Sequence, residues 1–179
     1  MSLKVAIQMD PIEFIDIAAD STFRLMEEAQ FCGHELFYYT PDQLAFEEGI
    51  ITATGWPISV RREVGDHFTK GKLTKVNLAD WDVVWLRQDP PFDMGYITNT
   101  HLLDMIHPDT LVVNDPQWVR NYPEKLLVLK FPELTPPTTI ARDIKTLKVF
   151  KDKYKDIILK PLYGNGGAGV FRLDENDKN

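Results

Sequence analysis

A lysine followed by a glycine-rich loop stands near the end of the sequence. Lys160 closes an apolar run, and the loop that follows contains Gly164-Asn165-Gly166-Gly167-Ala168-Gly169. Because glycine has no Cβ, such a backbone can approach phosphate oxygens closely, and successive N–H groups can converge on an anion. A hydrogen bond from a lysine to phosphate contributes roughly 1.5–3 kcal/mol. The pattern therefore predicts a nucleotide-phosphate site; the alternative, from the loop alone, is a tight hairpin with a solvated lysine.

The residues around the loop discriminate between the kinds of phosphate loop. Residues 164–169 satisfy G-x-G-x-x-G, but a dinucleotide site needs a helix directly after the glycines and an acidic residue about 20 positions later. The strand pattern Val170-Phe171-Arg172-Leu173 follows instead. In a Walker A loop the lysine follows the glycines, whereas Lys160 precedes them. A nicotinamide dehydrogenase is therefore the weakest interpretation, and a hairpin flap over ATP phosphates is favoured.

A second group of charged residues follows a predicted strand in the middle of the chain. The strand pattern of residues 81–87 ends at Arg87 and continues into Gln88-Asp89-Pro90-Pro91-Phe92-Asp93. The prolines end the strand and favour an extended loop at its carboxyl end. Arg87 can clamp a substrate carboxylate there through two parallel hydrogen bonds. The alternative is a surface ion pair between Arg87 and either Asp89 or Asp93.

The start of the chain predicts the sheet that holds this loop. Residues 3–9 form an apolar strand pattern, a helix capped by Asp20 follows, and residues 35–39 form the next strand. The helix carries an apolar face of Phe23, Met26, Ala29 and Leu25, and it ends at Gly33. A β-α-β opening predicts parallel strands, whose carboxyl ends bind ligands. The turn at Asp10-Pro11 lies at such an end.

The other predicted elements continue the alternation of strands and helices. In chain order they are hairpins within 44–60 and 72–78, the strand at 81–87, a helix at 96–106, a strand at 110–113, a helix starting at 116, a helical segment at 122–130, a strand at 138–141, a capped helix at 143–154, and strands at 156–160 and 170–173. The prolines at 132, 136 and 137 indicate a boundary between two domains.

Composition excludes several classes of function. The chain has 179 residues, of which 44% are hydrophobic, and 27 acidic against 20 basic residues give a net charge of -7, which disfavours nucleic acid as a partner. No 18-residue apolar stretch predicts a membrane span, and the first apolar run is too short for a signal peptide, so we expect a soluble, cytoplasmic protein. The single cysteine, Cys32, is expected to be a small core residue, and the four histidines lack zinc-ligand spacing.

Several motifs that span the chain in order carry a family resemblance. They are Gln8-Met9-Asp10-Pro11-Ile12, Asp20-Ser21-Thr22-Phe23, Leu86-Arg87-Gln88-Asp89-Pro90-Pro91-Phe92-Asp93, Val113-Asn114-Asp115-Pro116, Asn121 with Glu124-Lys125-Leu126, and Leu159-Lys160-Pro161-Leu162 with Gly164, Gly166 and Gly167. Through these motifs the chain closely resembles the N-terminal half of the bacterial glutathione synthetases, which are ATP-grasp ligases. The block from Arg87 to Asp93 is the most family-specific of them, and Tyr163 departs from the acidic residue expected there.

The resemblance implies an α/β fold and an activity. The fold would be a pre-ATP-grasp domain with a parallel sheet and helices on both faces over residues 1–122, followed by the beginning of an ATP-grasp domain over residues 123–179. Members of the family condense γ-glutamylcysteine with glycine through an acyl phosphate, using ATP as co-substrate and Mg²⁺ as cofactor. Small molecules are therefore the expected partners, with a homo-oligomer as a further possibility.

The resemblance also assigns roles to residues of this sequence. Lys125 and Lys160 would contact ATP, and the flap would be formed by Gly164, Asn165, Gly166, Gly167, Ala168 and Gly169. Asp10, Arg87 and Asp89 would lie on the peptide-substrate side.

The magnesium ligands are expected outside this chain, which resembles only part of a complete enzyme. Asp174, Glu175 and Asp177 lie in a polar tail and are not expected to bind the metal. Two alternatives stay open. One is an ATP-grasp ligase with another amino-acid acceptor, and the other is a non-catalytic binding module, if the natural chain ends at residue 179.

Overall fold

The structure is a computed structural model, and it describes residues 1–164 and 166–175. The chain divides into two compact units, Met1–Asn121 and Tyr122–Asn179, and each is described by itself. The prolines at 132, 136 and 137 lie inside the second unit, so the division precedes the boundary that they indicated.

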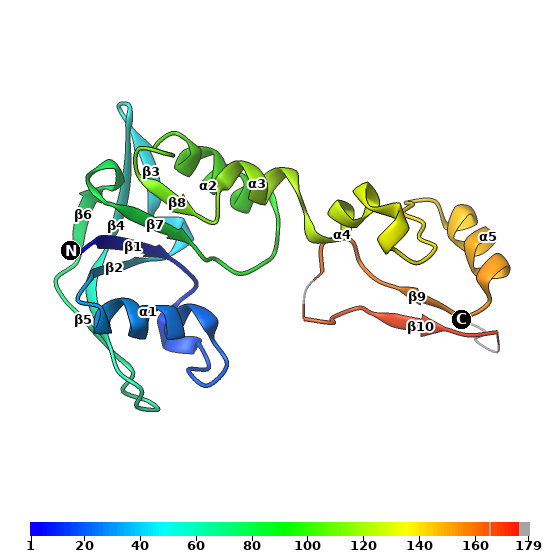
Figure 1. Cartoon of the computed structure of the whole chain (residues 1–179), viewed down its shortest axis with the longest axis horizontal. Helices are drawn as coiled ribbons and strands as arrows, with labels where there is room; N and C mark the ends of the chain where they lie inside the picture. Colours follow the sequence, from blue (N-terminus) through cyan, green and yellow to red (C-terminus); the bar gives the residue numbers. More distant parts are fainter. Residues whose placement is uncertain (165, 176–179) are drawn as a thin grey trace. The chain divides into compact units, whose positions relative to one another are not determined.

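The centre of the first unit is a parallel sheet (Figure 1). Its strands lie in the order β2 (Glu35–Tyr39), β1 (Lys4–Gln8), β7 (Val83–Leu86) and β8 (Leu111–Val113), and each neighbouring pair is parallel. The strand patterns predicted from the sequence at these positions are confirmed. Residues on both faces of β1 and β2 are buried, as expected for parallel strands that are covered on two sides.

The predicted hairpins form an antiparallel extension of the same sheet. They are β3 (Leu44–Glu47), β4 (Ile50–Val60), β5 (Phe68–Lys70) and β6 (Thr74–Asn77). Strand β4 pairs antiparallel with β2 and joins all eight strands into one sheet. A Cβ at Gly55 would lie 2.2 Å from the carbonyl oxygen of Tyr38, so this close approach of two backbones requires glycine.

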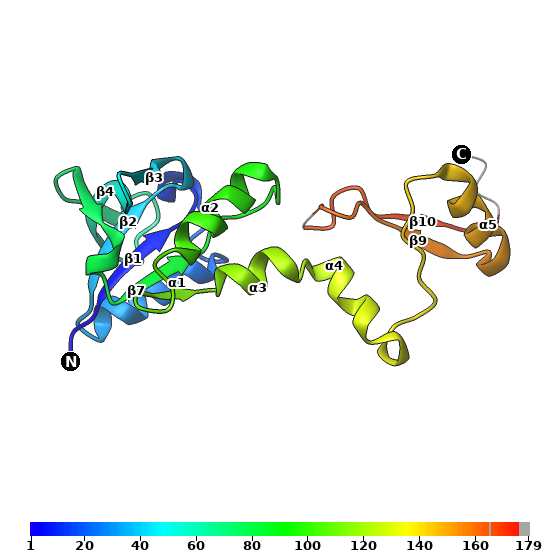
Figure 2. The ribbon, with the colours of Figure 1, turned by 90° about the horizontal axis from the view of Figure 1, so that it is seen from above.

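Helices cover both faces of the sheet, as predicted; Figure 1 shows α1 and α2 on opposite sides of it, and Figure 2 shows the same elements from above. Helix α1 (Ser21–Phe31) packs on the face that carries Val5, Ile7, Leu36 and Tyr38. Helix α2 (Met94–Asp104) packs on the opposite face, where alternate residues of the same strands meet Leu103. The short helix α3 (Pro116–Asn121) lies beside α2. The first unit therefore has two buried apolar layers, one on each side of the sheet.

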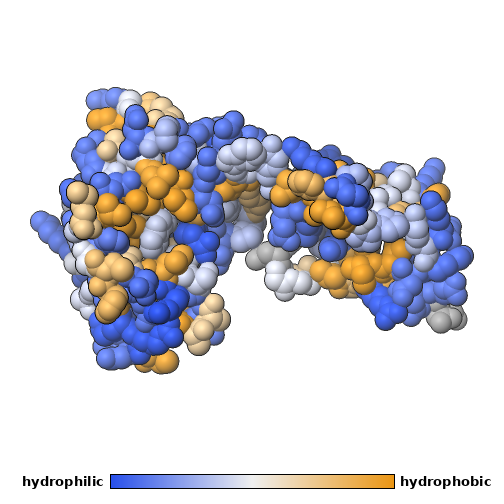
Figure 3. All heavy atoms as spheres, in the orientation of Figure 1, coloured by the Kyte–Doolittle hydropathy of each residue, from blue (hydrophilic) through white to orange (hydrophobic). Residues whose placement is uncertain are grey.

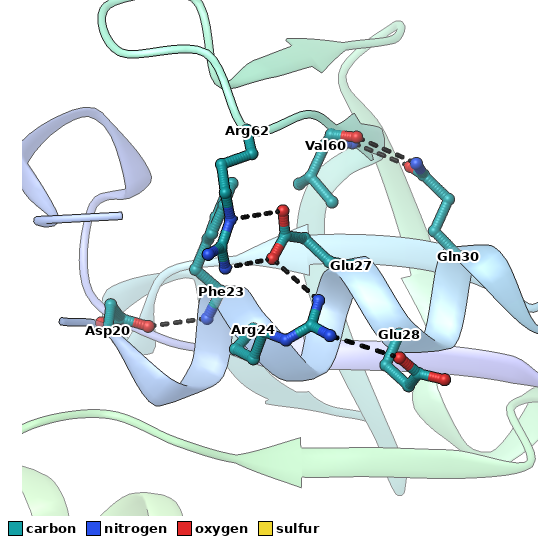
Figure 4. Close-up of polar contacts among 8 residues, drawn as sticks. All are labelled: Asp20, Phe23, Arg24, Glu27, Glu28, Gln30, Val60 and Arg62. Carbon is teal, nitrogen blue, oxygen red and sulfur yellow. Dashed lines mark hydrogen bonds and ion pairs between the residues drawn. The ribbon is translucent and has the colours of Figure 1, made fainter. Parts of the chain in front are cut away.

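Helix α1 begins at its predicted cap, because the Asp20 carboxylate accepts the N–H of Phe23 at 2.6 Å (Figure 4). Its outer face carries ion pairs of Arg24 and Arg62 with Glu27. Leu25 is exposed, in contrast to the other three apolar residues expected to face the core. Cys32 is exposed too, so its expected core position is wrong: it follows the last turn of the helix and lies outside the packed face.

Short 3-10 turns follow several of the strands and helices. In the first unit they are η1 (Ile12–Phe14), η2 (Pro41–Gln43) and η3 (Leu78–Asp80), and in the second unit η4 (Val128–Lys130) and η5 (Pro132–Leu134).

The second unit contains short elements around one hairpin. Helices α4 (Glu124–Leu127) and α5 (Ile144–Tyr154) precede strands β9 (Ile157–Leu159) and β10 (Phe171–Leu173), which pair antiparallel. The Asp143 carboxylate caps α5 by accepting the N–H of Thr146 at 2.8 Å, as the sequence predicted. The predicted strand at 138–141 is wrong: these residues have no regular structure and pair with no strand among the described residues.

Burial differs sharply between the two units. None of the described residues of the second unit is buried. Val149 is 68% exposed, Phe171 59% and Ile158 54%. Figure 3 shows hydrophobic residues gathered on the surface over β9.

Within the described ranges, none of the helices combines the length and the hydropathy that crossing a bilayer would require.

Candidate functional site

The carboxyl ends of the parallel strands bring two predicted site residues together. Asp10 follows β1, and Asp89 follows β7, which is the neighbour of β1 in the sheet. The backbone N–H of Asp89 donates to Oδ2 of Asp10 at 2.5 Å. The hydroxyl of Tyr38 lies 3.5 Å from the carbonyl oxygen of Asp10 and accepts the N–H of Ile12 at 3.2 Å, which ties this turn to β2. Both predicted carboxylates therefore lie at one edge of the sheet.

Arg87, the third predicted residue at this edge, is oriented by the first turn of α1. Its Nε donates to Oγ1 of Thr22 at 3.0 Å, and its Nη2 donates to Oγ of Ser21 at 2.8 Å. The alternative of a surface ion pair finds no support, because none of the ion pairs among the described residues contains Arg87. Asp93 instead caps α2 by accepting the N–H of Tyr96 at 2.9 Å.

The charges at this edge act on one another. Partial desolvation raises the pKa of Asp89 above its usual value, and the nearby carboxylates of Asp10 and Asp20 raise it further, while Arg87 opposes the shift. Desolvation also raises the pKa of the Tyr96 phenol, again against the influence of Arg87. The negative charges of the aspartates thus lie close to one another and to the positive guanidinium of Arg87. Such an arrangement can bind a zwitterion, with its carboxylate on the arginine and its ammonium on the carboxylates.

Three amides at the same edge were not identified from the sequence. Gln8 is the last residue of β1 and is fully buried, Gln88 lies between Arg87 and Asp89, and Asn99 belongs to α2. Nε2 of Gln8 and Nδ2 of Asn99 both donate to Oε1 of Gln88, at 2.5 and 2.9 Å. The polar side chain of Gln8 at the end of a buried strand was the signal that could have revealed them.

The glycine-rich loop of the second unit connects β9 to β10. Gly166, Gly167 and Gly169 all have positive φ, and a Cβ at Gly169 would lie 2.8 Å from Cγ of Pro161. The loop therefore requires glycine for its turn and for the close approach of its two sides. Gly164 and Ala168 belong to the same turn, and Asn165, also predicted to bind ATP, lies outside the described residues.

Two predicted lysines lie differently relative to this loop. Nζ of Lys125, on α4, donates a hydrogen bond to the carbonyl oxygen of Gly164, so the first lysine and the loop lie together. Lys160 directly follows β9, is exposed, and makes no hydrogen bond or ion pair within the described part of the chain. The unit thus combines a cationic side chain at the loop with a second one at the end of the preceding strand.

The described residues do not supply a metal site. They contain no group of three or more histidine, cysteine, aspartate or glutamate side chains placed to hold a metal ion. Of the acidic residues in the polar tail, Asp174 and Glu175 are described, and Asp177 lies outside the described residues.

Comparisons with known families match both units. Residues 3–120 match the family described as "Prokaryotic glutathione synthetase, N-terminal domain", and residues 124–179 match "Prokaryotic glutathione synthetase, ATP-grasp domain". The two matches together leave only short gaps at residues 1–2 and 121–123.

Curated relatives are similar over the entire chain. The glutathione synthetase of Brucella melitensis is 56% identical over 179 residues, which are 100% of this chain and 57% of that protein. The glutathione synthetase of Bradyrhizobium diazoefficiens is 55% identical with the same coverage. The chain therefore spans a little over half the length of these relatives.

One solved structure gives a weaker match. It is the ATP-grasp ligase PsnB complexed with minimal precursor, with a TM-score of 0.49 and 15% identity over 99% of this chain and 58% of that chain. A likeness at this level carries no argument about function.

Proposed function

The chain belongs to the prokaryotic glutathione synthetase family, and on this premise we propose that the whole protein joins γ-glutamylcysteine to glycine at the expense of ATP. In this reaction the cysteinyl carboxylate of the dipeptide takes the γ-phosphoryl group of ATP and releases ADP. The amine of glycine then attacks the acyl phosphate, forming the peptide bond and releasing phosphate.

The observation that carries the proposal is the contact between Lys125 and the glycine-rich loop. The Lys125 ammonium already donates to the backbone of Gly164, so it is placed to exchange that acceptor for a phosphate oxygen. The backbone N–H groups of the turn add donors without side chains in the way. Lys160 adds a second positive charge at the end of β9. We assign ATP binding to Lys125, Lys160, Gly164, Asn165, Gly166, Gly167, Ala168 and Gly169.

The peptide substrate is assigned to the first unit. The γ-glutamyl end of γ-glutamylcysteine carries an α-carboxylate and an α-ammonium group. Arg87, held by two hydroxyls of α1, suits the carboxylate, and Asp10 and Asp89 suit the ammonium group. This edge of the sheet is where parallel α/β folds bind ligands.

Magnesium is proposed as the cofactor because transfer of a phosphoryl group needs compensation of the charge on the triphosphate. Among the described residues, no three or more histidine, cysteine, aspartate or glutamate side chains are placed to hold the metal ion. The protein is further proposed to work in the cytoplasm on small-molecule substrates.

The proposal is tested by release of ADP from the protein encoded by the complete reading frame. ATP, magnesium and γ-glutamylcysteine are supplied with and without glycine. Release of ADP that depends on both the dipeptide and glycine, together with formation of glutathione, is expected. Release that depends on a different amine would assign another acceptor, and absence of release with every amine would contradict the ligase activity.

A further inference from the structure

Gln88 accepts hydrogen bonds from two amide groups that belong to different elements. Nε2 of Gln8, at the end of β1, lies 2.5 Å from Oε1 of Gln88, and Nδ2 of Asn99, on α2, lies 2.9 Å from the same oxygen. Nδ2 of Asn99 also donates to the carbonyl oxygen of Pro41 at 3.3 Å, in the turn that follows β2. The side chains of Gln88 and Asn99 together thus connect the carboxyl ends of three neighbouring strands to α2.

The backbone on each side of Gln88 is tied to β1 as well. The N–H of Arg87 donates to the carbonyl oxygen of Gln8 at 2.8 Å, and the N–H of Asp89 donates to the Asp10 carboxylate at 2.5 Å. Gln88 is therefore held at its side chain, and its neighbours are held at their backbones. Gln88 lies between the two residues that carry the guanidinium and the carboxylate, so its side-chain contacts act on the backbone that joins Arg87 to Asp89.

Packing alone does not explain why glutamine occupies position 8. Gln8 is 0% exposed, and its Oε1 finds no hydrogen-bond partner in the described part of the chain. A buried amide oxygen without a partner destabilises a folded protein. An apolar side chain of similar shape, such as methionine, would fill the same volume without that cost. The buried amide of Gln8 therefore lowers stability relative to an apolar side chain of the same shape.

We propose that Gln88, fixed by Gln8 and Asn99, is a positioning residue that sets the distance between Arg87 and Asp89 to match the zwitterionic γ-glutamyl end of the substrate. This inference rests on the proposed function, which places that group at Arg87 and Asp89. The amides do not touch the reacting atoms. They act through the loop that carries the two binding residues, so their loss is felt in the affinity for the dipeptide.

The test uses the complete enzyme with Gln88→Met and Asn99→Leu, each of which removes one end of the amide contacts. KM for γ-glutamylcysteine, KM for ATP and Tm are measured for each variant. Misplacement of binding groups by about 1 Å can cost up to ~100-fold, so we expect the dipeptide KM to rise about 10- to 100-fold. The ATP KM stays within about twofold. Tm falls in Gln88→Met, because the buried Nε2 of Gln8 loses its acceptor, so the rise in the dipeptide KM, and not Tm, reports the positioning role.

Gln30→Met is the matched control. Gln30 is also a glutamine with two hydrogen bonds to neighbouring structure, since its Nε2 donates to the carbonyl oxygen of Val60 at 2.9 Å and its Oε1 accepts the N–H of Val60 at 2.8 Å (Figure 4). It lies near the other end of α1 from Ser21 and Thr22. Its loss is expected to lower Tm and to leave both KM values unchanged.

Arg87→Lys separates the inference from the function on which it rests. If Arg87→Lys raises the dipeptide KM but Gln88→Met and Asn99→Leu lower only Tm, the positioning role is wrong and the proposed substrate site stands. If Arg87→Lys leaves the dipeptide KM unchanged, the substrate site itself is wrong, and the positioning role falls with it. Should Gln88→Met fail to fold, Asn99→Leu decides by the same criteria.

Discussion

The two units of the chain place their candidate binding groups by different means. In the first unit, residues of three strand ends and a helix converge above two buried apolar layers. In the second unit no described residue is buried, and hydrogen bonds such as that from Lys125 to Gly164 connect its elements. Arg172, for example, binds Asp156 through two nitrogens across the strand pair, at 3.0 and 2.7 Å.

The difference in burial affects how narrowly each unit restricts the positions of its side chains. A side chain anchored in close-packed surroundings keeps its position within narrow limits, because neighbouring groups leave no room for other arrangements. The described residues of the second unit make their contacts at the surface of a chain that spans a little over half the length of its relatives. Packing thus restricts the residues around the candidate site of the first unit, whereas a hydrogen bond connects the lysine and the glycine loop of the second.

The largest expected effect is the loss of folding stability when a leucine is replaced by alanine, which should differ between the two units. Leu103→Ala removes a fully buried side chain of α2 and should lower the free energy of unfolding by about 2–5 kcal/mol. Leu134→Ala makes the same change at a residue that is 78% exposed and should stay within about 0.5 kcal/mol. Urea unfolding measures both. Equal losses would break the comparison, because they would mean that Leu134 is covered in solution.

The next largest effect concerns the lysines of the second unit. Lys125→Ala and Lys160→Ala should each lower kcat/KM for ATP by about 10- to 150-fold, since a charge-assisted hydrogen bond contributes roughly 1.5–3 kcal/mol. Steady-state kinetics of the complete enzyme measure this. Lys148→Ala, at an exposed lysine of α5, is the control and should leave the kinetics unchanged. Retained turnover in both test variants would refute the phosphate assignment.

A smaller loss of stability is expected when a helix cap is removed, and each unit offers one such cap. Asp20→Ala should lower the free energy of unfolding by about 1 kcal/mol, because α1 is part of the packed core. It should also raise KM for the dipeptide, since the first turn of α1 orients Arg87. Urea titration and initial rates give the two values. An unchanged stability would show that the cap is not needed where the core already holds the helix.

Asp143 provides the corresponding cap in the second unit. Hydrogen bonds from Thr146 and Lys145 lower the pKa of its carboxyl below the usual value. The cap therefore contributes above the ordinary carboxyl pKa and is lost as the pH falls through the lowered value. Amide exchange of Thr146, corrected for its intrinsic pH dependence, should accelerate over this range in the natural protein but not in Asp143→Ala. An identical pH dependence in both proteins would contradict this.

The smallest expected effect is on how folding stability depends on pH through Asp89, at the carboxyl edge of the sheet. The raised pKa of Asp89 means that the folded state binds this proton more tightly than the unfolded state, so ionisation opposes folding as the pH rises through the raised value. Asp89→Asn should thus be more stable than the natural protein at neutral pH, with the gain vanishing in acid. Asp109→Asn, at an exposed residue, should show no such trend. If Asp89→Asn remained more stable than the natural protein at pH values below the pKa range of carboxyl groups, the negative charge of Asp89 would not be the cause of the gain.

Local patterns were enough to predict most of the elements. The apolar runs at 3–9 and 35–39, the caps at Asp20 and Asp143, and the glycines at 164–169 each have a cause within a few residues, and the strands, helix starts and turn are found there. The strand predicted at 138–141 fails for the opposite reason. Its residues suit a strand, but pairing depends on a partner elsewhere in the chain, and none is present among the described residues.

The sequence by itself therefore determined the kinds of elements, the glycine turn and the residue types available for binding, because propensity, capping and positive φ act over short distances along the chain. Only the tertiary structure decided which side chains meet. The partners of Arg87 lie 65 and 66 positions away, and those of Gln88 lie 80 and 11 positions away. Strand order brings them together, and strand order depends on which buried faces pack best over the entire sheet.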